Sequence, residues 1–174
     1  FLLLNGCNNA LTGSSISLHE IYENNIKTEL HFCPQDNCSS IITKNVKDAK
    51  RSVHCAFWDI DLGDSIKAIA RKSHTADVKL VIDDRNYDGQ IKGDGVKIAK
   101  SGRYMHNKFC VIDGYSVLTG STNPTDNGVN FNNNNILILN SKYIANNYED
   151  EFNELWNGVY ASGEVAKYKQ VNSE

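Results

Sequence analysis

The sequence lacks any apolar run of the roughly 18 residues that a membrane-spanning helix needs. It also lacks an excess of positive charge, since its net charge is −3 and its pI is near 6.0. The chain as a whole therefore does not attract nucleic acid strongly, and any anion-binding site must be local. With 174 residues, 40% of them hydrophobic and 22% charged, it is long enough for one globular domain with a real core.

The five cysteines do not follow the ligand spacing of a zinc site. Cys33 and Cys38 are close enough to form a disulfide across the loop CPQDNC, but no second close Cys/His pair could complete four zinc ligands. Cys55 and Cys110 lie inside apolar strand patterns and are expected to be buried thiols. An even number of cysteines besides Cys7 is compatible with an oxidising compartment.

The first seven residues resemble the end of a secretory signal followed by a lipobox. Four apolar residues precede Asn5-Gly6-Cys7, which predicts a lipid on Cys7 and an extracytoplasmic protein anchored at the cell membrane. The alternative is an ordinary short strand. Residues 1–26 are then a signal remnant and tether, with a weak helical pattern at Leu18, Ile21 and Tyr22.

Periodicity predicts alternating strands and helices over a domain at 27–160, followed by a polar, loose C-terminal tail at 161–174. Strands are expected at 28–33, 52–60, 77–84, 107–112, 116–119 and 135–140, a further short strand at 95–101, and helices at about 37–50, 65–73 and 141–156. The initial order of strand, helix, strand, helix, strand favours an α/β fold with a mixed, largely parallel sheet between helices. The Gly/Asp-rich loop at 85–95 is a natural active-site rim.

Polar side chains with phosphate-binding chemistry surround the hairpin within MHNKFCVIDGYSVLTGSTN. Alternation places His106 and Lys108 on one side of the strand, about 7 Å apart, with Phe109 on the core side. Ser121 and Asn123 repeat that spacing after the second strand. An imidazole, an ammonium, a hydroxyl and an amide suit a tetrahedral phosphoryl group, with the imidazole as nucleophile or acid. No carboxylate cluster accompanies them, so the sequence calls for no metal or other cofactor.

Each piece alone has an ordinary structural explanation, because an H-x-K pair is usually a solvated face and Asp-Gly is a common hairpin turn. The joint spacing His106-x-Lys108-x4-Asp113-x6-Gly120-Ser121-x-Asn123 is more specific. It resembles the HKD signature of the phospholipase D superfamily at every fixed position. The segments FCP, DAKRSVHCAFW, VKLVIDD and YEDEFNELW extend the resemblance over about residues 27–158. A single motif is similar to the small bacterial endonucleases and to the mitochondrial cardiolipin-hydrolase branch.

The resemblance implies a homodimer, since two such motifs meet at one active site in this superfamily. One His106 would attack phosphorus to form a phosphohistidine, and the His106 of the second copy would protonate the leaving oxygen and then activate water. Lys108, Ser121 and Asn123 would hold the phosphate oxygens, and Asp113 would orient the motif. Relatives carry a Glu where this chain has Asn134, which can still orient the imidazole or contact substrate but cannot neutralise an imidazolium. Asp59 or Asp61 could supply the missing carboxylate.

Three functions remain open from the sequence. The first is a metal-independent endonuclease-like phosphodiesterase acting on DNA or RNA. The second has the same chemistry on a phospholipid, as a phospholipase D or cardiolipin-type hydrolase, and a lipidated Cys7 would favour it. The third, suggested by Asn134, is a non-catalytic module that binds nucleic acid or phospholipid.

Overall fold

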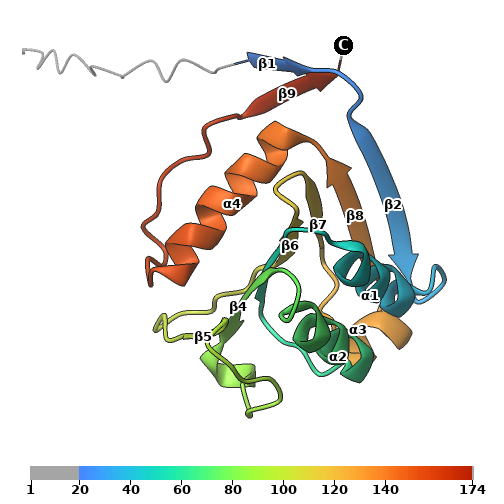
Figure 1. Cartoon of the computed structure of the whole chain (residues 1–174), viewed down its shortest axis with the longest axis vertical. Coiled ribbons are helices and arrows are strands. Elements are labelled where there is room, and N and C mark those ends of the chain that lie inside the picture. The colour runs from blue at the N-terminus through green and yellow to red at the C-terminus, as the bar shows by residue number, and fades with distance from the viewer. Residues whose placement is uncertain (1–19, 174) are drawn as a thin grey trace, which may run out of the picture.

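A seven-stranded mixed sheet forms the centre of the computed structural model, which describes residues 20–173 (Figure 1). Its strands, in spatial order, are β2 (Lys27–Cys33), β8 (Asn134–Asn140), β7 (Ser116–Gly120), β6 (Lys108–Ile112), β3 (Ser52–Phe57), β4 (Asp77–Asp83) and β5 (Val96–Ala99). The helices are α1 (Cys38–Asp48), α2 (Gly63–Lys72), α3 (Asp126–Asn130) and α4 (Lys142–Trp156), with a short 3₁₀ turn at Asp84–Asn86. The strands β1 (Glu20–Glu23) and β9 (Gln170–Ser173) form a separate pair.

The α/β class and the helical layers on both faces are as expected. The expectation of a largely parallel sheet is wrong, because most neighbouring strands pair in antiparallel fashion. Of six neighbouring pairs, β3–β4 and β4–β5 are parallel and the other four are antiparallel. The strands of the strand–helix–strand units do share one direction, as right-handed crossovers require. The oppositely directed β6 and β8 are inserted among them, and they separate β2 from β3.

Helices cover the sheet on both faces (Figure 1), and the central strands β3, β4 and β6 are buried on both sides over most of their length. Helices α1 and α2 pack over side chains that include Cys55, Phe57 and Cys110. Helix α4 packs over the other face through Phe152 and Leu155, against Phe109 among others. The earlier expectation that only the Phe109 side of β6 faces a core is therefore incomplete, because Cys110 and Ile112, which follow Lys108 on its side, are buried too.

Local sequence signals explain where the two long helices begin. The Asn37 side chain accepts a hydrogen bond from the Ser40 N–H and caps α1, and Ser141 caps α4 through the N–H of Ile144. Asp113 and Gly114 have φ values of 56° and 65°, as the two central residues of a type I′ turn require, and the Ile112 carbonyl accepts a hydrogen bond from the Tyr115 N–H. The turn lies in a three-residue loop between the paired Ile112 and Ser116.

The segments that flank the domain are ordered differently from expectation. Ile21 and Tyr22 lie in β1 rather than in a helix, and β1 pairs in parallel with β9 from the C-terminal tail. The tail is also held by Asn147, which exchanges hydrogen bonds with the backbone of Tyr168. Within residues 20–173, no helix has the length and apolar character needed to cross a membrane. Cys7 and the expected lipobox lie outside the described residues.

Two disulfides occur among the described residues. The Cys33–Cys38 bond closes the loop between β2 and α1. The expectation of free thiols at Cys55 and Cys110 is wrong: both are buried, but they are bonded to each other. The antiparallel register of β3 and β6 places them directly opposite, with their Cα atoms 4.0 Å apart.

Candidate active site

The polar motif residues gather at one edge of the sheet, where β3, β4 and β7 end and β6 and β8 begin. His106 lies in the loop just before β6, and Lys108 is its first residue. Phe109 pairs with Thr119, which brings Lys108 level with Gly120 and therefore next to Ser121. Antiparallel pairing thus joins residues that are 13 or more positions apart in the chain.

His106 is exposed, and its ring lies against Trp58, with the ring centroids 5.2 Å apart. The backbone carbonyl of the next residue, Asn107, accepts a hydrogen bond from the Trp58 N–H at 2.9 Å. Partial desolvation and the nearby charge of Lys108 lower the pKa of His106, and the charge of Asp83 opposes them. A neutral imidazole is therefore favoured near pH 7, and only this form has a free ring nitrogen that can act as a nucleophile.

Lys108 is half-buried beside this imidazole. Its Nζ donates to the His106 carbonyl at 3.0 Å, which keeps the ammonium on the side of the nucleophile. Burial lowers the pKa of Lys108, while the carboxylate of Asp59 raises it. Of the two suggested carboxylates, Asp59 thus acts on Lys108, and Asp61 accepts a hydrogen bond from the N–H of Asp126, the first residue of α3.

Ser121 is held by the start of β8. Its hydroxyl lies 3.0 Å from the side-chain oxygens of both Asn134 and Asn135, and it accepts from the Asn135 N–H. Gly120 permits this approach, because a Cβ at that position would lie 2.2 Å from the Asn135 carbonyl oxygen. Asn134 therefore positions the Ser121 hydroxyl and also donates to the Gly128 carbonyl.

Asn123 has a half-buried side chain at the same edge. Its side-chain oxygen is buried without a hydrogen-bond partner in the structure. Unpaired buried polar atoms are costly, and a partner supplied by substrate is one common explanation.

Asp113, expected among the catalytic residues, lies at the opposite end of β6 from His106. The five residues of β6 alone span about 16 Å at 3.3 Å per residue, and Asn107 adds to this separation. The Asp113 carboxylate accepts hydrogen bonds from the backbone N–H groups of Lys50, Arg51 and Ser52. It therefore anchors the hairpin to the start of β3 and cannot touch a phosphate held by His106.

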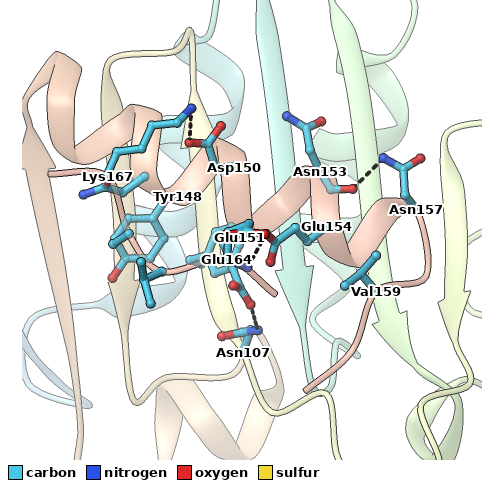
Figure 2. A pocket seen from close by; sticks show the side chains of 14 residues that line it. Asn107, Tyr148, Asp150, Glu151, Asn153, Glu154, Asn157, Val159, Glu164 and Lys167 are labelled. Carbon is cyan, nitrogen blue, oxygen red and sulfur yellow. Dashed lines mark hydrogen bonds and ion pairs between the residues drawn. The ribbon is translucent and has the colours of Figure 1, made fainter. Parts of the chain in front are cut away.

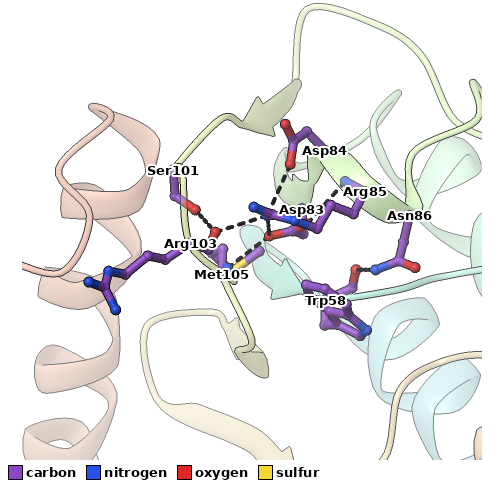
Figure 3. A network of polar contacts seen from close by, with 8 residues as sticks. All are labelled: Trp58, Asp83, Asp84, Arg85, Asn86, Ser101, Arg103 and Met105. Atoms are coloured by element: carbon purple, nitrogen blue, oxygen red, sulfur yellow. Dashed lines mark hydrogen bonds and ion pairs between the residues drawn. The ribbon is translucent and has the colours of Figure 1, made fainter.

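A second polar network, which the sequence did not reveal, holds the loop before His106 (Figure 3). The fully buried carboxylate of Asp83, at the end of β4, accepts from the Met105 N–H at 2.8 Å. Arg85 pairs with Asp83 and donates to the Arg103 carbonyl at 2.9 Å. The acidic end of the strand 77–84 was the available signal, but a sequence cannot show which distant N–H a carboxylate meets.

A cavity of about 730 Å³ lies on the α4 side, between this helix and residues 159–167 (Figure 2). Asn107 points into it and donates to Glu151 at 3.3 Å. The cavity lining does not include His106, Lys108 or Ser121, so it is separate from the polar edge. The described residues also contain no group of three or more His, Cys, Asp or Glu side chains arranged to hold a metal ion.

The arrangement combines one exposed imidazole, one ammonium beside it, and hydroxyl and amide groups after the neighbouring strand, and such groups can bind and attack a phosphoryl group. The ammonium and the hydroxyl can stabilise the charge on non-bridging phosphate oxygens. In-line displacement also needs an acid for the leaving oxygen. Within residues 20–173, none of the site residues described above is a second histidine. His54, for example, is buried under α4.

Comparison with known proteins agrees with this geometry. Residues 42–156 match the family model described as cardiolipin synthase, PLD-like domain. A mitochondrial cardiolipin hydrolase of Xenopus laevis is 40% identical over 137 residues, covering 71% of this chain and 65% of that protein. The matching protein of Xenopus tropicalis is 43% identical over 70 residues, covering 39% of this chain and 33% of that protein. The chain therefore spans less than two-thirds of the length of these relatives.

Solved structures share the fold at low identity. Nuc from Salmonella typhimurium, described as a phospholipase D family member, superposes with a TM-score of 0.69 at 23% identity, covering 76% of this chain and 95% of that one. NucT from Helicobacter pylori gives a TM-score of 0.59 at 20% identity, covering 76% and 97% of the two chains. The family match over residues 42–156 shows that the chain belongs to the phospholipase D superfamily, and the fold of these neighbours agrees with it.

Proposed function

We propose that this protein hydrolyses phosphodiester bonds of nucleic acid through a covalent phosphohistidine on His106. The observation that carries the proposal is the exposed imidazole of His106, with its lowered pKa, beside the Lys108 ammonium. Such a pair combines a neutral nucleophile with a positive charge that stabilises the pentacoordinate phosphate.

The second imidazole comes from a second copy of the chain in this proposal. A ring nitrogen of one His106 forms a bond to phosphorus as the bond to the leaving oxygen breaks, and the protonated His106 of the second copy gives its proton to that oxygen. The latter imidazole then removes a proton from water, whose oxygen attacks phosphorus and releases the first His106. The two imidazoles begin in opposite protonation states, so activity should follow a bell-shaped pH curve that belongs to the pair.

Local charge supports a polyanionic substrate despite the net charge of −3. Residues 95–112, which lead into and form the catalytic strand, contain Lys97, Lys100, Arg103 and Lys108 and no Asp or Glu. A positive segment beside the nucleophile attracts a phosphate backbone and raises the association rate.

The direct test incubates the protein with single-stranded DNA, RNA and plasmid DNA in EDTA, in parallel with His106→Ala. Cleavage by the parent and its loss in the variant are expected. A protein that leaves all three substrates intact would refute the nuclease proposal. Light scattering tests the shared site: active protein that is monomeric at assay concentration would contradict it.

A phospholipid substrate is the second candidate, because the relatives with the highest identity quoted above are named cardiolipin hydrolases. The same assay with cardiolipin vesicles compares the two substrate classes directly. Head-group or phosphatidate release without DNA or RNA cleavage would select this alternative. The third candidate, a module that only binds, predicts no phosphohistidine when the reaction is quenched rapidly in acid-free conditions.

We further propose an extracytoplasmic location with lipid attachment at Cys7. The disulfides Cys33–Cys38 and Cys55–Cys110 support an oxidising compartment. Labelling with radioactive palmitate, compared with Cys7→Ser, tests the attachment.

A further inference from the structure

We propose that Tyr104 is a stacking platform for the nucleobase next to the scissile phosphate, and that the substrate is therefore single-stranded or locally unpaired nucleic acid. This inference rests on the proposed nuclease function and narrows its substrate. It is argued from the position of Tyr104, from the way its backbone is held, and from the kinds of side chain exposed at the catalytic edge.

Tyr104 is two residues from His106 and belongs to a row of side chains in contact that leads to it. The Trp58 ring lies against His106 at 5.2 Å and meets Tyr104 nearly at right angles at 4.8 Å. The Arg85 guanidinium lies over the Tyr104 ring at 4.7 Å. The row therefore runs from a cation through two aromatic rings to the nucleophile.

The Tyr104 ring is 68% exposed although its backbone is firmly held. The carbonyl before it, on Arg103, accepts from Arg85, and the N–H after it, on Met105, donates to the buried Asp83 (Figure 3). An exposed aromatic ring on an anchored backbone loses little conformational entropy when a ligand stacks on it. This preorganisation is what a binding platform needs.

The large apolar side chains exposed at this edge are aromatic. Phe32, the second-last residue of β2, is 56% exposed, and Phe131, which follows α3, is 70% exposed. The exposed aliphatic residues of the described chain lie elsewhere: Leu30 is within β2, and Val159 and Val165 are in the C-terminal segment. Flat rings with adjacent cations favour nucleobases over acyl chains, because every base has a π-face that can stack on them.

A base that is paired within a duplex has both faces covered by its neighbours, so it cannot stack on Tyr104. Stacking of one base on one aromatic side chain contributes about 1–3 kcal/mol, which corresponds to about 5- to 150-fold in affinity. Tyr104 is thus expected to act on KM for single strands and to have little effect on kcat.

The test compares the effect of removing the Tyr104 ring with the effect of removing the substrate base that would stack on it. Tyr104→Ala and Tyr104→Phe are assayed on a single-stranded oligonucleotide with one cleavable phosphodiester, and on the same oligonucleotide with abasic residues flanking it. Tyr104→Ala should raise KM about 5- to 150-fold on the intact strand and leave KM on the abasic strand almost unchanged, and Tyr104→Phe should retain parental KM. Tyr115→Ala removes an exposed tyrosine at the far end of the β6–β7 hairpin and is the matched control.

The possible failures are distinguishable. A parent protein that cleaves no oligonucleotide refutes the nuclease function itself. If the parent cleaves but Tyr104→Ala has an unchanged KM, or raises KM equally on intact and abasic strands, the stacking proposal alone is overturned. A weaker dimer in light scattering of Tyr104→Ala would place Tyr104 between copies and would also overturn it. Circular dichroism and the retained activity of Tyr104→Phe show whether the position tolerates substitution.

Discussion

The buried carboxylate of Asp83 accepts a hydrogen bond from the backbone N–H of Met105, the residue directly before His106. Asp83 has no exposed side-chain surface, and its negative charge opposes the effects of burial and Lys108 that lower the pKa of His106. Asp83 on β4 therefore holds the loop that carries His106 and supplies a negative charge near its imidazole. Asn134 supplies no such charge.

Asp83→Asn should shift both limbs of the pH–activity curve toward lower pH. Removal of the negative charge leaves burial and Lys108 unopposed, so the pKa of His106 falls further. The measurement is kcat/KM between pH 4 and 9. Asp84→Asn, at a half-exposed neighbour that also contacts Arg85, is the matched control; an identical shift there would contradict a specific effect of Asp83.

Asp113→Ala should destabilise the fold by about 1–3 kcal/mol, because backbone N–H groups of Lys50, Arg51 and Ser52 lose their acceptor. Burial raises the pKa of Asp113, but these N–H groups lower it more. The stabilisation is therefore present above the ordinary pKa of about 3.9 and is lost as pH falls through the lowered value.

Urea unfolding at pH 3 and pH 6 measures this dependence on Asp113. Asp113→Asn keeps one acceptor oxygen and tolerates the positive φ, so it should lie between the parent and Asp113→Ala. Folded Asp113→Ala should keep the parental pH–activity profile. A shifted profile would show that Asp113 takes part in catalysis.

The free energy of unfolding should fall as the pH rises above neutrality, because His54 then loses the proton that its two carboxylate partners stabilise. Burial lowers the pKa of His54, but the hydrogen bonds and charges of Glu149, at 2.6 Å, and Asp77, at 3.1 Å, raise it more. Because the folded pKa is raised, the stabilisation is complete below the unfolded value near 6.5 and is lost as pH rises through the folded value.

Glu149→Gln should lower stability by about 1–3 kcal/mol at pH 6 and flatten the pH dependence between pH 6 and 9. The free energy of unfolding in urea measures both effects. His74→Gln, at an exposed histidine after α2, is the control. If the pH dependence of stability is unchanged in Glu149→Gln, the contacts of His54 are not its cause.

The two disulfides should contribute unequally to stability. Cys55 and Cys110 are 55 positions apart, whereas Cys33 and Cys38 are five apart. The chain-entropy relation assigns about 4 kcal/mol to the long loop and about 2 kcal/mol to the short one. Denaturant midpoints of the two paired Cys→Ala variants, each with and without reductant, test this order. Equal losses would point to strain or cavities instead.

Short-range signals explain how much of the fold and of the site could be predicted. The caps at Asn37 and Ser141 and the Asp113-Gly114 turn depend on neighbouring residues, so their elements occur close to the expected ranges. Strand alternation likewise brought His106 and Lys108 to one edge. The sequence also placed Asp113 at the other end of this strand, because His106 precedes the expected strand 107–112 and Asp113 follows it. It did not show which backbone N–H groups the Asp113 carboxylate meets, because that depends on how β6 pairs with β3.

The sequence by itself determined the α/β class, the direction of the strand–helix–strand units and the polar residues that lie around His106, since periodicity and turn chemistry act over a few positions. Only the tertiary structure decided the insertion of β6 and β8, which makes most of the pairs antiparallel. It likewise decided the Cys55–Cys110 bond and the contact of Asp83 with the His106 loop. These features depend on which strands pair and in what register, and that is set by the packing of the whole core.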